Sequence, residues 1–215
     1  SIYRNYDIRG VYPTEINEDV VRSIGRALVD IYHPASVAIG YDNRPSTDAL
    51  KAALIEGITM QGANVVDIGM VTTPMLYHIS GSTDAEVAIM LTASHLSSEY
   101  NGLKICIDNA VPIGLDSGLR EVKEYVERGE FVSTDTKGTV ISLDPLPLWY
   151  KQVADLSDQK EDGKEITIVV DPANAVGILE IATLKTCGKN LVVESIFDTL
   201  DHRAPHHEAN PIKHE

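Results

Sequence analysis

Ser94, His95, Asn101 and Lys104 lie close together in the sequence, in and just after a polar loop. The segments that flank the loop, 87–91 and 103–107, are apolar and rich in β-branched residues, which predicts two buried strands. Open α/β sheets bind ligands where strands end, so a hydroxyl at position 94 should be exposed on a rigid support. A serine followed by a histidine suggests, first of all, a nucleophile and its base.

The sequence argues against that hydrolase interpretation. Neighbouring side chains on an extended segment point to opposite faces, so Ser94 and His95 are poorly placed to share a hydrogen bond. No Gly-x-Ser-x-Gly elbow surrounds Ser94. By themselves, Ser94 and His95 are better interpreted as ordinary residues of a surface loop.

The wider loop resembles a known family. Thr-Ala-Ser-His at 92–95, followed by Tyr-Asn-Gly-Leu-Lys at 100–104, resembles the active-site serine loop of the α-D-phosphohexomutases, the phosphomannomutases and phosphoglucomutases. In that family the loop reads Thr-Ala-Ser-His-Asn-Pro, and Asn-Gly-x-Lys follows it. The serine carries the transferable phosphoryl group. Leu96 and Ser97 stand where the family usually has Asn and Pro.

A second resemblance lies near the start of the chain. The stretch Tyr-Asp-Ile-Arg-Gly at 6–10 could be a solvated arm, but it resembles the family's Tyr-Asp-x-Arg-Gly signature, whose arginine reaches the active site. The planar guanidinium of Arg9 is suited to phosphate oxygens. The resemblance also implies a role for each candidate. Ser94 would carry the phosphoryl group and, through its phosphate, bind Mg²⁺, while Arg9 would contact phosphate. His95 and Lys104 would serve proton transfer or charge stabilisation, and Tyr6 and Asn101 would shape the substrate pocket.

The surrounding pattern predicts the elements that position these residues. A helix capped by Asn17, a strand at 37–41, a helix after Ser46 or Thr47 that stops at Gly62, a strand at 65–68 and a helix from Pro74 precede the serine loop. Strand–helix–strand passages predict parallel crossovers, whereas the short serine loop predicts an antiparallel last strand. A further helix ends at Gly129.

The predicted fold is therefore α/β, a three-layer αβα arrangement with a mixed, mostly parallel sheet. The family resemblance implies a complete first domain over 1–140 with a four-stranded mixed sheet, and an incomplete α/β domain II over 141–215. Segment 131–147 is interpreted as a linker or edge structure, before a helix at 148–156, a strand at 166–170, a helix from 178 that stops at Gly188, and a strand at 191–196.

Two loops remain open to more than one interpretation. The turn with Asp42 and Arg44 resembles the family's Gly-x-Asp-x-Arg turn, and a structural ion pair is favoured over direct catalysis. The histidines of the tail, with neighbouring acidic residues, suggest either a metal site or, by resemblance, the family's His-x-Pro-Asn-Pro-like loop. The stretch at 171–175 resembles an Asp-x-x-Asn-Gly turn, with Ala175 in place of glycine.

Composition limits the possible partners. The formal net charge of −14 argues against nucleic acid and anionic membranes, but a local cation cluster could still bind a phosphosugar. Without a secretory signal or a long apolar run, a cytoplasmic location is expected. Two cysteines far apart in sequence predict reduced thiols.

The predicted function is that of a phosphosugar mutase, an isomerase that interconverts hexose 6-phosphate and hexose 1-phosphate through a phosphoserine and a bisphosphate. The resemblance implies Mg²⁺ as cofactor and hexose 1,6-bisphosphate as activator. It also implies C-terminal domains of the same chain that supply an Asp-Gly-Asp-x-Asp-Arg metal loop, a sugar-selecting loop and a phosphate-anchoring loop, so this N-terminal half should be inactive alone. The alternative is a non-catalytic binding or regulatory module, which the residues at 96, 97 and 175 favour.

Overall fold

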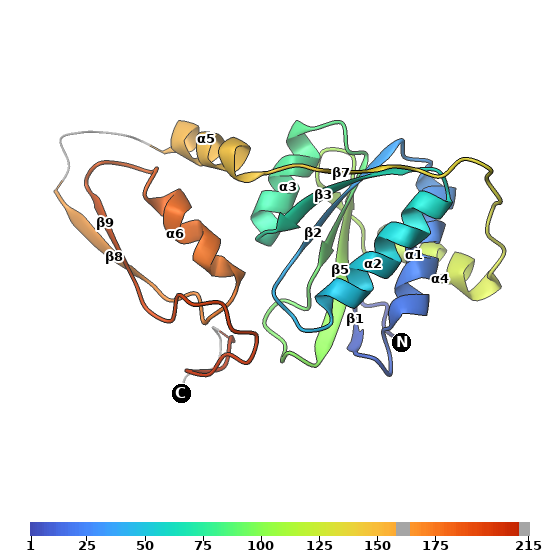
Figure 1. Cartoon of the computed structure of the whole chain (residues 1–215), viewed down its shortest axis with the longest axis horizontal. Coiled ribbons are helices and arrows are strands. Elements are labelled where there is room, and N and C mark those ends of the chain that lie inside the picture. Colours follow the sequence, from blue (N-terminus) through green and yellow to red (C-terminus); the bar gives the residue numbers. More distant parts are fainter. Residues whose placement is uncertain (158–163, 211–215) are drawn as a thin grey trace. The chain divides into compact units, whose positions relative to one another are not determined.

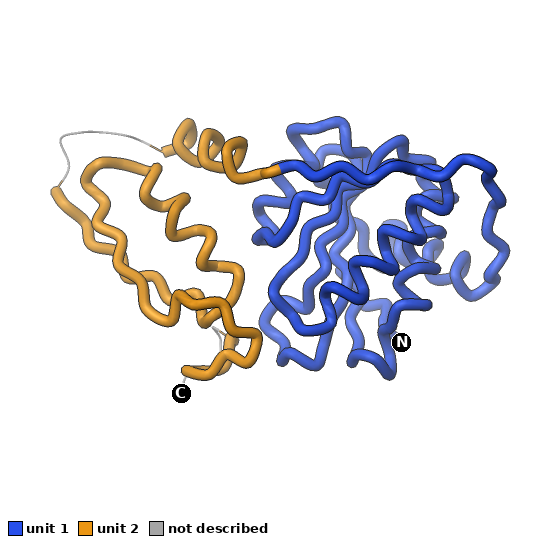
Figure 2. The backbone as a smooth tube through the Cα atoms, in the orientation of Figure 1, with its two compact units in different colours: residues 1–143 blue, residues 144–215 orange. Residues whose placement is uncertain are grey.

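The computed structural model describes residues 1–157 and 164–210. The chain forms two compact units, residues 1–143 and 144–215, which are described separately (Figure 2). No helix in the described residues is long and apolar enough to cross a membrane. Cys106 and Cys187 are both free thiols, as predicted.

Unit 1 alternates strands and helices along most of its length (Figure 1). Asn17 accepts a hydrogen bond from the amide of Val20 and so caps the first helix, as predicted. Gly129 ends the last helix in the left-handed conformation. The strands are β1 (Ile8–Val11), β2 (Ser36–Tyr41), β3 (Asn64–Met70), β4 (Val87–Leu91), β5 (Tyr100–Ile107), β6 (Val111–Pro112) and β7 (Val140–Ser142), and the α-helices are α1 (Glu18–Tyr32), α2 (Thr47–Met60), α3 (Thr73–Ser82) and α4 (Leu119–Arg128).

These seven strands form one sheet in the order β1-β5-β4-β2-β3-β7, with β6 paired to β5. Strands β4, β2, β3 and β7 pair in parallel, whereas β5 is antiparallel to each of its partners β4, β1 and β6. All strands except β5 therefore run in one direction. The predicted mixed, mostly parallel sheet and the antiparallel strand after the serine loop are both confirmed.

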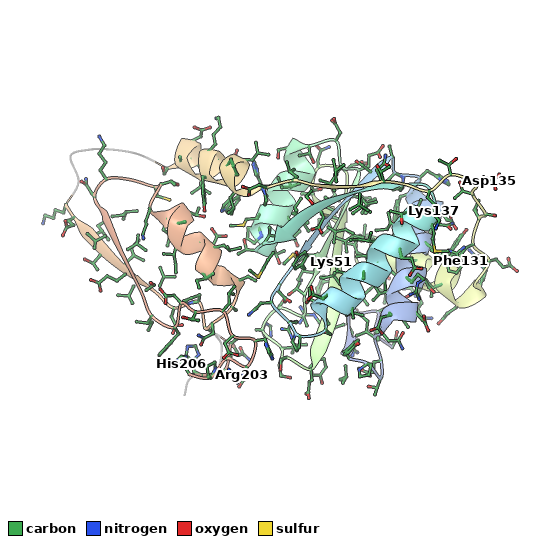
Figure 3. All side chains as sticks on the ribbon, viewed as in Figure 1. Lys51, Phe131, Asp135, Lys137, Arg203 and His206 are labelled. Atoms are coloured by element: carbon green, nitrogen blue, oxygen red, sulfur yellow. The ribbon has the colours of Figure 1, made fainter. Side chains whose placement is uncertain are left out.

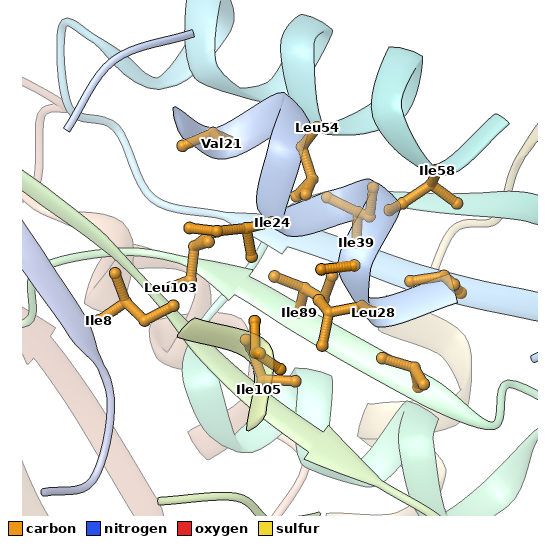
Figure 4. Close-up of a cluster of buried hydrophobic side chains, with 14 of the residues drawn as sticks. Ile8, Val21, Ile24, Leu28, Ile39, Leu54, Ile58, Ile89, Leu103 and Ile105 are labelled. Carbon is orange, nitrogen blue, oxygen red and sulfur yellow. The ribbon is translucent and has the colours of Figure 1, made fainter. Parts of the chain in front are cut away.

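Helices cover both faces of this sheet. Helices α1, α2 and α4 pack on one face and α3 on the other (Figure 1). In β4, Val87, Ile89 and Leu91 belong to the core cluster that also contains residues of α1 and α2, in which Figure 4 labels Ile89, while the alternate residues Ala88 and Met90 are buried outside that cluster. A strand apolar on both faces is what a central strand of a three-layer fold requires. The end of β4 is therefore a rigid support.

The sheet is wider than the expected four strands. The outer strand β1 lies in the stretch considered as a possible solvated arm, and β7 lies in segment 131–147, which proved to contain an edge strand. Neither strand is both long and apolar, so the period-two pattern was too weak to identify them. The predicted helix ends agree with the structure: α2 ends at Met60, and Gly62 follows it with a φ of 91°, while the helix of unit 2 that was expected to end before Gly188 stops at Leu184.

Unit 2 is a small β-α-β arrangement. After α5 (Leu146–Leu156), β8 (Ile166–Val170) and β9 (Leu191–Ser195) pair in parallel, and they are linked through the 3₁₀ turn Val176–Ile178 and α6 (Leu179–Leu184). The indole nitrogen of Trp149 donates to Glu180, which ties α5 to α6. Val169, which is 59% exposed, illustrates how little of this two-stranded sheet is buried within the described residues.

Candidate active site

Ser94 lies just beyond the end of β4, on a loop whose backbone is unusually shaped. Its φ of 55° is in the left-handed region, and its side chain is exposed. The amide of Ser94 donates to Oγ1 of Thr92 over 2.9 Å, so this backbone donor is already satisfied. A non-glycine residue in this region costs roughly 1 to 3 kcal/mol and often marks a functional position. The hydroxyl is thus presented to solvent from a fixed turn.

Arg9 reaches this serine from the outer strand β1, which is separated from β4 by β5. Antiparallel pairing of β1 with β5 sets Arg9 opposite Gly102. The guanidinium then donates from Nη2 to Oγ of Ser94 and from Nη1 to the carbonyl oxygen of Ala93, each over 3.3 Å. The structure therefore brings together two of the predicted site residues that are 85 positions apart in the sequence.

Asp7 joins Arg9 to a second cation, Lys104. A single oxygen, Oδ2 of Asp7, lies 2.8 Å from Nε of Arg9 and 3.2 Å from Nζ of Lys104. Asp7 is only 6% exposed, so this carboxylate is screened from water more than a surface partner would be. Asp7 was not among the sequence candidates. The available signal was its spacing of two from Arg9, which places both side chains on one face of a strand.

Asn101 supports the loop from below. It is fully buried, and its Nδ2 donates to Oγ of Ser46 over 2.9 Å and toward Oγ1 of Thr47 over 3.4 Å. Its Oδ1 accepts from the amide of Gly102. Ser46 occupies the N-cap position of α2 without a capping side-chain bond, and its hydroxyl oxygen accepts from Asn101. Asn101 thereby fastens the start of β5 to the start of α2.

Tyr6 and His95 stand apart from this network. Tyr6 is 81% exposed and His95 is half-buried, and neither side chain forms a hydrogen bond within residues 1–157 and 164–210. The hydroxyl of Ser94 is bonded to Arg9 and not to His95, in keeping with the argument against a nucleophile–base pair of sequence neighbours. Their roles in substrate binding and proton transfer stay predictions.

Arg44 forms the predicted ion pair, with Asp42 at 3.1 Å, and both side chains are 9% exposed. Its guanidinium also donates to the carbonyl oxygens of Ser94 and Leu96, each over 2.7 Å, and to those of Ser97 and Tyr100. Burial lowers the pKa of Arg44, and the neighbouring Asp42 opposes that shift. An always-charged guanidinium thus lies beneath the serine loop.

The site is locally cationic in an acidic chain. Arg9, Arg44 and Lys104 outnumber the carboxylates Asp7 and Asp42 that pair with them. Excess positive charge around an exposed hydroxyl is suited to holding a phosphoryl group there. The donor set does not fit a divalent cation, which prefers several carboxylate and carbonyl oxygens. Within the described part of the chain, no group of three or more His, Cys, Asp or Glu side chains could hold a metal ion.

A second polar cluster lies where β8 and β9 end, in unit 2. His206 Nδ1 lies 2.9 Å from Oδ1 of Asn174, and His207 Nε2 lies 2.9 Å from Oδ2 of Asp171. The imidazole of His206 (labelled in Figure 3) stacks on Phe197, with ring centroids 4.1 Å apart. The turn at 171–175 and the histidine loop of the tail, which both resembled family motifs, are thus bonded to each other. The alternative of a metal site at these histidines finds no support among the described residues, and His214 lies outside them.

Comparison with known proteins agrees with this geometry. The family described as "Phosphoglucomutase/phosphomannomutase, alpha/beta/alpha domain I" matches residues 1–133. A phosphomannomutase of Escherichia coli is 32% identical over 174 residues, which are 80% of this chain and 38% of that protein. A phosphomannomutase/phosphoglucomutase of Pseudomonas aeruginosa is 32% identical over an alignment that covers the whole chain and 45% of that protein.

A solved structure supports the same assignment. The crystal structure of a phosphoglucomutase/phosphomannomutase family protein from Burkholderia thailandensis superposes with a TM-score of 0.85 and 26% identity, over 96% of this chain and 46% of that one. The chain thus spans less than half the length of these relatives. The serine loop, the fold that carries it and the matched domain lead to one conclusion: the chain belongs to the phosphoglucomutase/phosphomannomutase family.

Proposed function

We propose that this chain carries the phosphoryl-transfer serine of a phosphosugar mutase, which interconverts hexose 6-phosphate and hexose 1-phosphate. The observation that carries the proposal is the exposed Oγ of Ser94, 3.3 Å from the guanidinium of Arg9. The names of the relatives support the class of reaction. The proposal of a cytoplasmic protein that acts on a small phosphosugar accords with the net charge of −14, which disfavours polyanionic partners.

In the proposed reaction, phosphorylated Ser94 gives its phosphoryl group to the free hydroxyl of a hexose monophosphate. The bond from phosphorus to Oγ breaks while a bond to the sugar oxygen forms, and the sugar's proton passes to Oγ or to a nearby base. His95 and Lys104 are the proposed groups for that proton or for the charge. The resulting hexose 1,6-bisphosphate then returns its other phosphoryl group to Ser94, which completes an isomerisation.

Arg9 and Lys104 serve the transfer by neutralising phosphoryl oxygens, on which charge is spread in the transition state. Asp7 pairs with both cations through Oδ2, which lies 2.8 Å from Nε of Arg9 and 3.2 Å from Nζ of Lys104. Tyr6, 81% exposed, is proposed to contact the sugar, and Asn101 to shape the pocket indirectly by fastening β5 to α2.

Mg²⁺ is proposed as cofactor, but the described residues do not fit it without help. Only a phosphate on Ser94 would supply a suitable ligand here, and no acidic cluster accompanies it. The remaining ligands and the sugar-selecting contacts are proposed to come from the length of the relatives that this chain does not match. Residues 1–215 alone are therefore expected to be poor catalysts.

The alternative is a non-catalytic binding or regulatory module on the same fold. Leu96, Ser97 and Ala175, which depart from the family pattern, are the residues that favour it.

A turnover assay separates the two. The protein isolated from its source organism should convert mannose 6-phosphate or glucose 6-phosphate to the 1-phosphate with Mg²⁺ and trace hexose 1,6-bisphosphate. A Ser94→Ala variant should lose this activity, whereas Ser98→Ala, at an ordinary loop position, should keep it. Absence of turnover with either sugar, in protein that binds the bisphosphate, would support the binding module instead.

A further inference from the structure

The serine loop surrounds the guanidinium of Arg44, whose side chain is only 9% exposed. Within the loop, the backbone bonds close short turns: the amide of Leu96 donates to the carbonyl oxygen of Ala93, and the amide of Tyr100 donates to that of Ser97. Most of the long-range hydrogen bonds to the loop come from the guanidinium of Arg44, more than fifty positions earlier in the case of Leu96, Ser97 and Tyr100. Arg9 adds bonds to Ala93 and Ser94, and the amide of Tyr12 donates to the carbonyl oxygen of Glu99. Four carbonyl oxygens between positions 94 and 100 converge on the guanidinium of Arg44.

This arrangement demands the shape of arginine. Nη2 serves the carbonyls of Ser94 and Leu96, Nη1 serves those of Ser97 and Tyr100, and Nε is left for Asp42. All three nitrogens are therefore used, in the plane that a guanidinium fixes. A lysine has the charge but only one nitrogen, so it could not serve both halves of the loop and Asp42 together.

The acceptors in the loop are all backbone carbonyl oxygens, so these bonds do not depend on the side chains at positions 96 and 97. Leu96 and Ser97 replace Asn and Pro, yet their carbonyl oxygens are available to Arg44 whatever their side chains are. The hydrogen bonds from Arg44 supply loop order that a proline would otherwise help to impose.

We propose that Arg44 is a positioning residue that holds the Ser94 loop in its reactive shape, with the left-handed φ of 55° at Ser94 and its Oγ facing Arg9. The loop keeps this shape without the Asn-Pro pair. The part of this inference that concerns reactivity rests on the proposed function, whereas the part that concerns loop order does not.

Loop order is tested first, by amide hydrogen exchange on the 215-residue chain. Arg44→Lys should speed exchange across 93–101 by about tenfold or more, because the loop then opens locally. Arg22→Lys is the matched control, since Arg22 bridges Asp19 and Glu56 on the surface of unit 1. Replacing Leu96 by Asn and Ser97 by Pro together should change exchange by no more than about twofold, because the carbonyl acceptors remain. If Arg44→Lys exchanges like Arg22→Lys, the inference is wrong.

Reactivity is tested by phosphoryl uptake on Ser94 from hexose 1,6-bisphosphate, in protein isolated from the source organism. Arg44→Lys should lower the rate at saturating bisphosphate about 10- to 100-fold, with the half-saturating concentration unchanged, because misplacement affects the transfer step. Guanidinium ion at low, non-denaturing concentration should restore part of the rate in Arg44→Ala, whereas ammonium ion should not. A raised half-saturating concentration with a normal saturated rate would mean that Arg44 acts on ligand binding, and would overturn the positioning role.

The two proposals fail separately. If wild-type protein takes up no phosphate, the proposed function is wrong, and the exchange of Arg44→Lys still decides whether Arg44 orders the loop. Should Arg44→Ala not fold, Arg44→Lys and the double variant at 96 and 97 carry the test.

Discussion

Nη2 of Arg9 donates to Oγ of Ser94 over 3.3 Å, although the two residues are 85 positions apart. The contact arises because β1 pairs with β5 and β5 pairs with β4, so the start of the chain lies one strand away from the serine loop. An anion on Ser94 would therefore meet a guanidinium that is already oriented by Asp7. Preorganised charge of this kind lowers the cost of reorganisation during transfer.

The left-handed backbone conformation of Ser94 is expected to lower the free energy of unfolding. Because its φ is 55°, Ser94→Gly should raise the free energy of unfolding by about 1 kcal/mol relative to Ser94→Ala. Chemical denaturation of the two variants measures this difference. Ser98→Gly is the control, because Ser98 has no positive φ, and there glycine should destabilise by about 0.5 to 1 kcal/mol relative to alanine. Equal effects at both positions would contradict the strained loop.

Asp7 is expected to set the efficiency of phosphoryl uptake. Asp7→Asn removes the charge shared by Arg9 and Lys104, so uptake on Ser94 should slow about 10-fold or more through misplacement of the cations. Rapid-quench measurement of uptake gives the rate. Asp116→Asn removes a carboxylate that is 89% exposed and pairs with Arg120, and it should leave the rate unchanged. Unaltered uptake in Asp7→Asn would rule out the bridging role.

Two glycine-to-alanine changes should act in opposite directions. A Cβ at Gly102 would lie 2.0 Å from the carbonyl oxygen of Ile8 on β1, so Gly102→Ala should destabilise by about 3 kcal/mol and free β1 from the sheet. Gly81, near the end of α3, has nothing within 4 Å of its added Cβ, so Gly81→Ala should stabilise by roughly 0.5 to 1 kcal/mol. Thermal unfolding compares them, and a stable Gly102→Ala would contradict the close approach of β1 and β5.

Tyr3 should make stability depend on pH in the alkaline range. Burial, and to a smaller extent Glu127, raise the pKa of Tyr3 to about 12, and its hydroxyl has no hydrogen-bond partner among the described residues. The neutral phenol is favoured in the fold, so its contribution to stability is complete below about pH 10, the ordinary tyrosine pKa, and is lost as pH rises from there through 12.

Tyr3→Phe removes both the unpaired hydroxyl and its titration. The variant should therefore be more stable than wild type by about 1 kcal/mol at neutral pH, and the gap should widen between pH 10 and 12. Urea denaturation across this range measures the gap. Tyr6→Phe, at an 81% exposed position, should match wild type throughout, and a gap that narrows with rising pH would contradict the buried phenol.

The central strands and the serine loop were predictable from the sequence, because β2 and β4 are apolar runs that end in polar turns. The antiparallel direction of β5 followed from the shortness of its connection. The outer strand β1 was missed, since Ile8–Val11 is short and carries arginine and glycine. An edge strand such as β1 is stabilised by hydrogen bonding to its neighbour more than by burial of its own side chains, so its hydrophobic pattern is weak.

The site was only partly predictable for a similar reason. Lys104 and Arg9 could be identified as candidates from their motifs, but their shared carboxylate, Asp7, depends on the register that sets Ile8 opposite Leu103. The four acceptors of Arg44 are backbone carbonyls, which leave no trace in side-chain identity. Such contacts follow from the three-dimensional path of the loop, and they become visible only in the folded chain.

The most direct test of the account is phosphopeptide mapping, combined with intact-mass measurement, of the protein from its source organism before and after incubation with hexose 1,6-bisphosphate and Mg²⁺. If Ser94 is the phosphoryl carrier, one phosphoryl group should be found on Ser94, and excess hexose monophosphate should remove it again. A protein that binds the bisphosphate yet never carries phosphate on Ser94 would contradict this role.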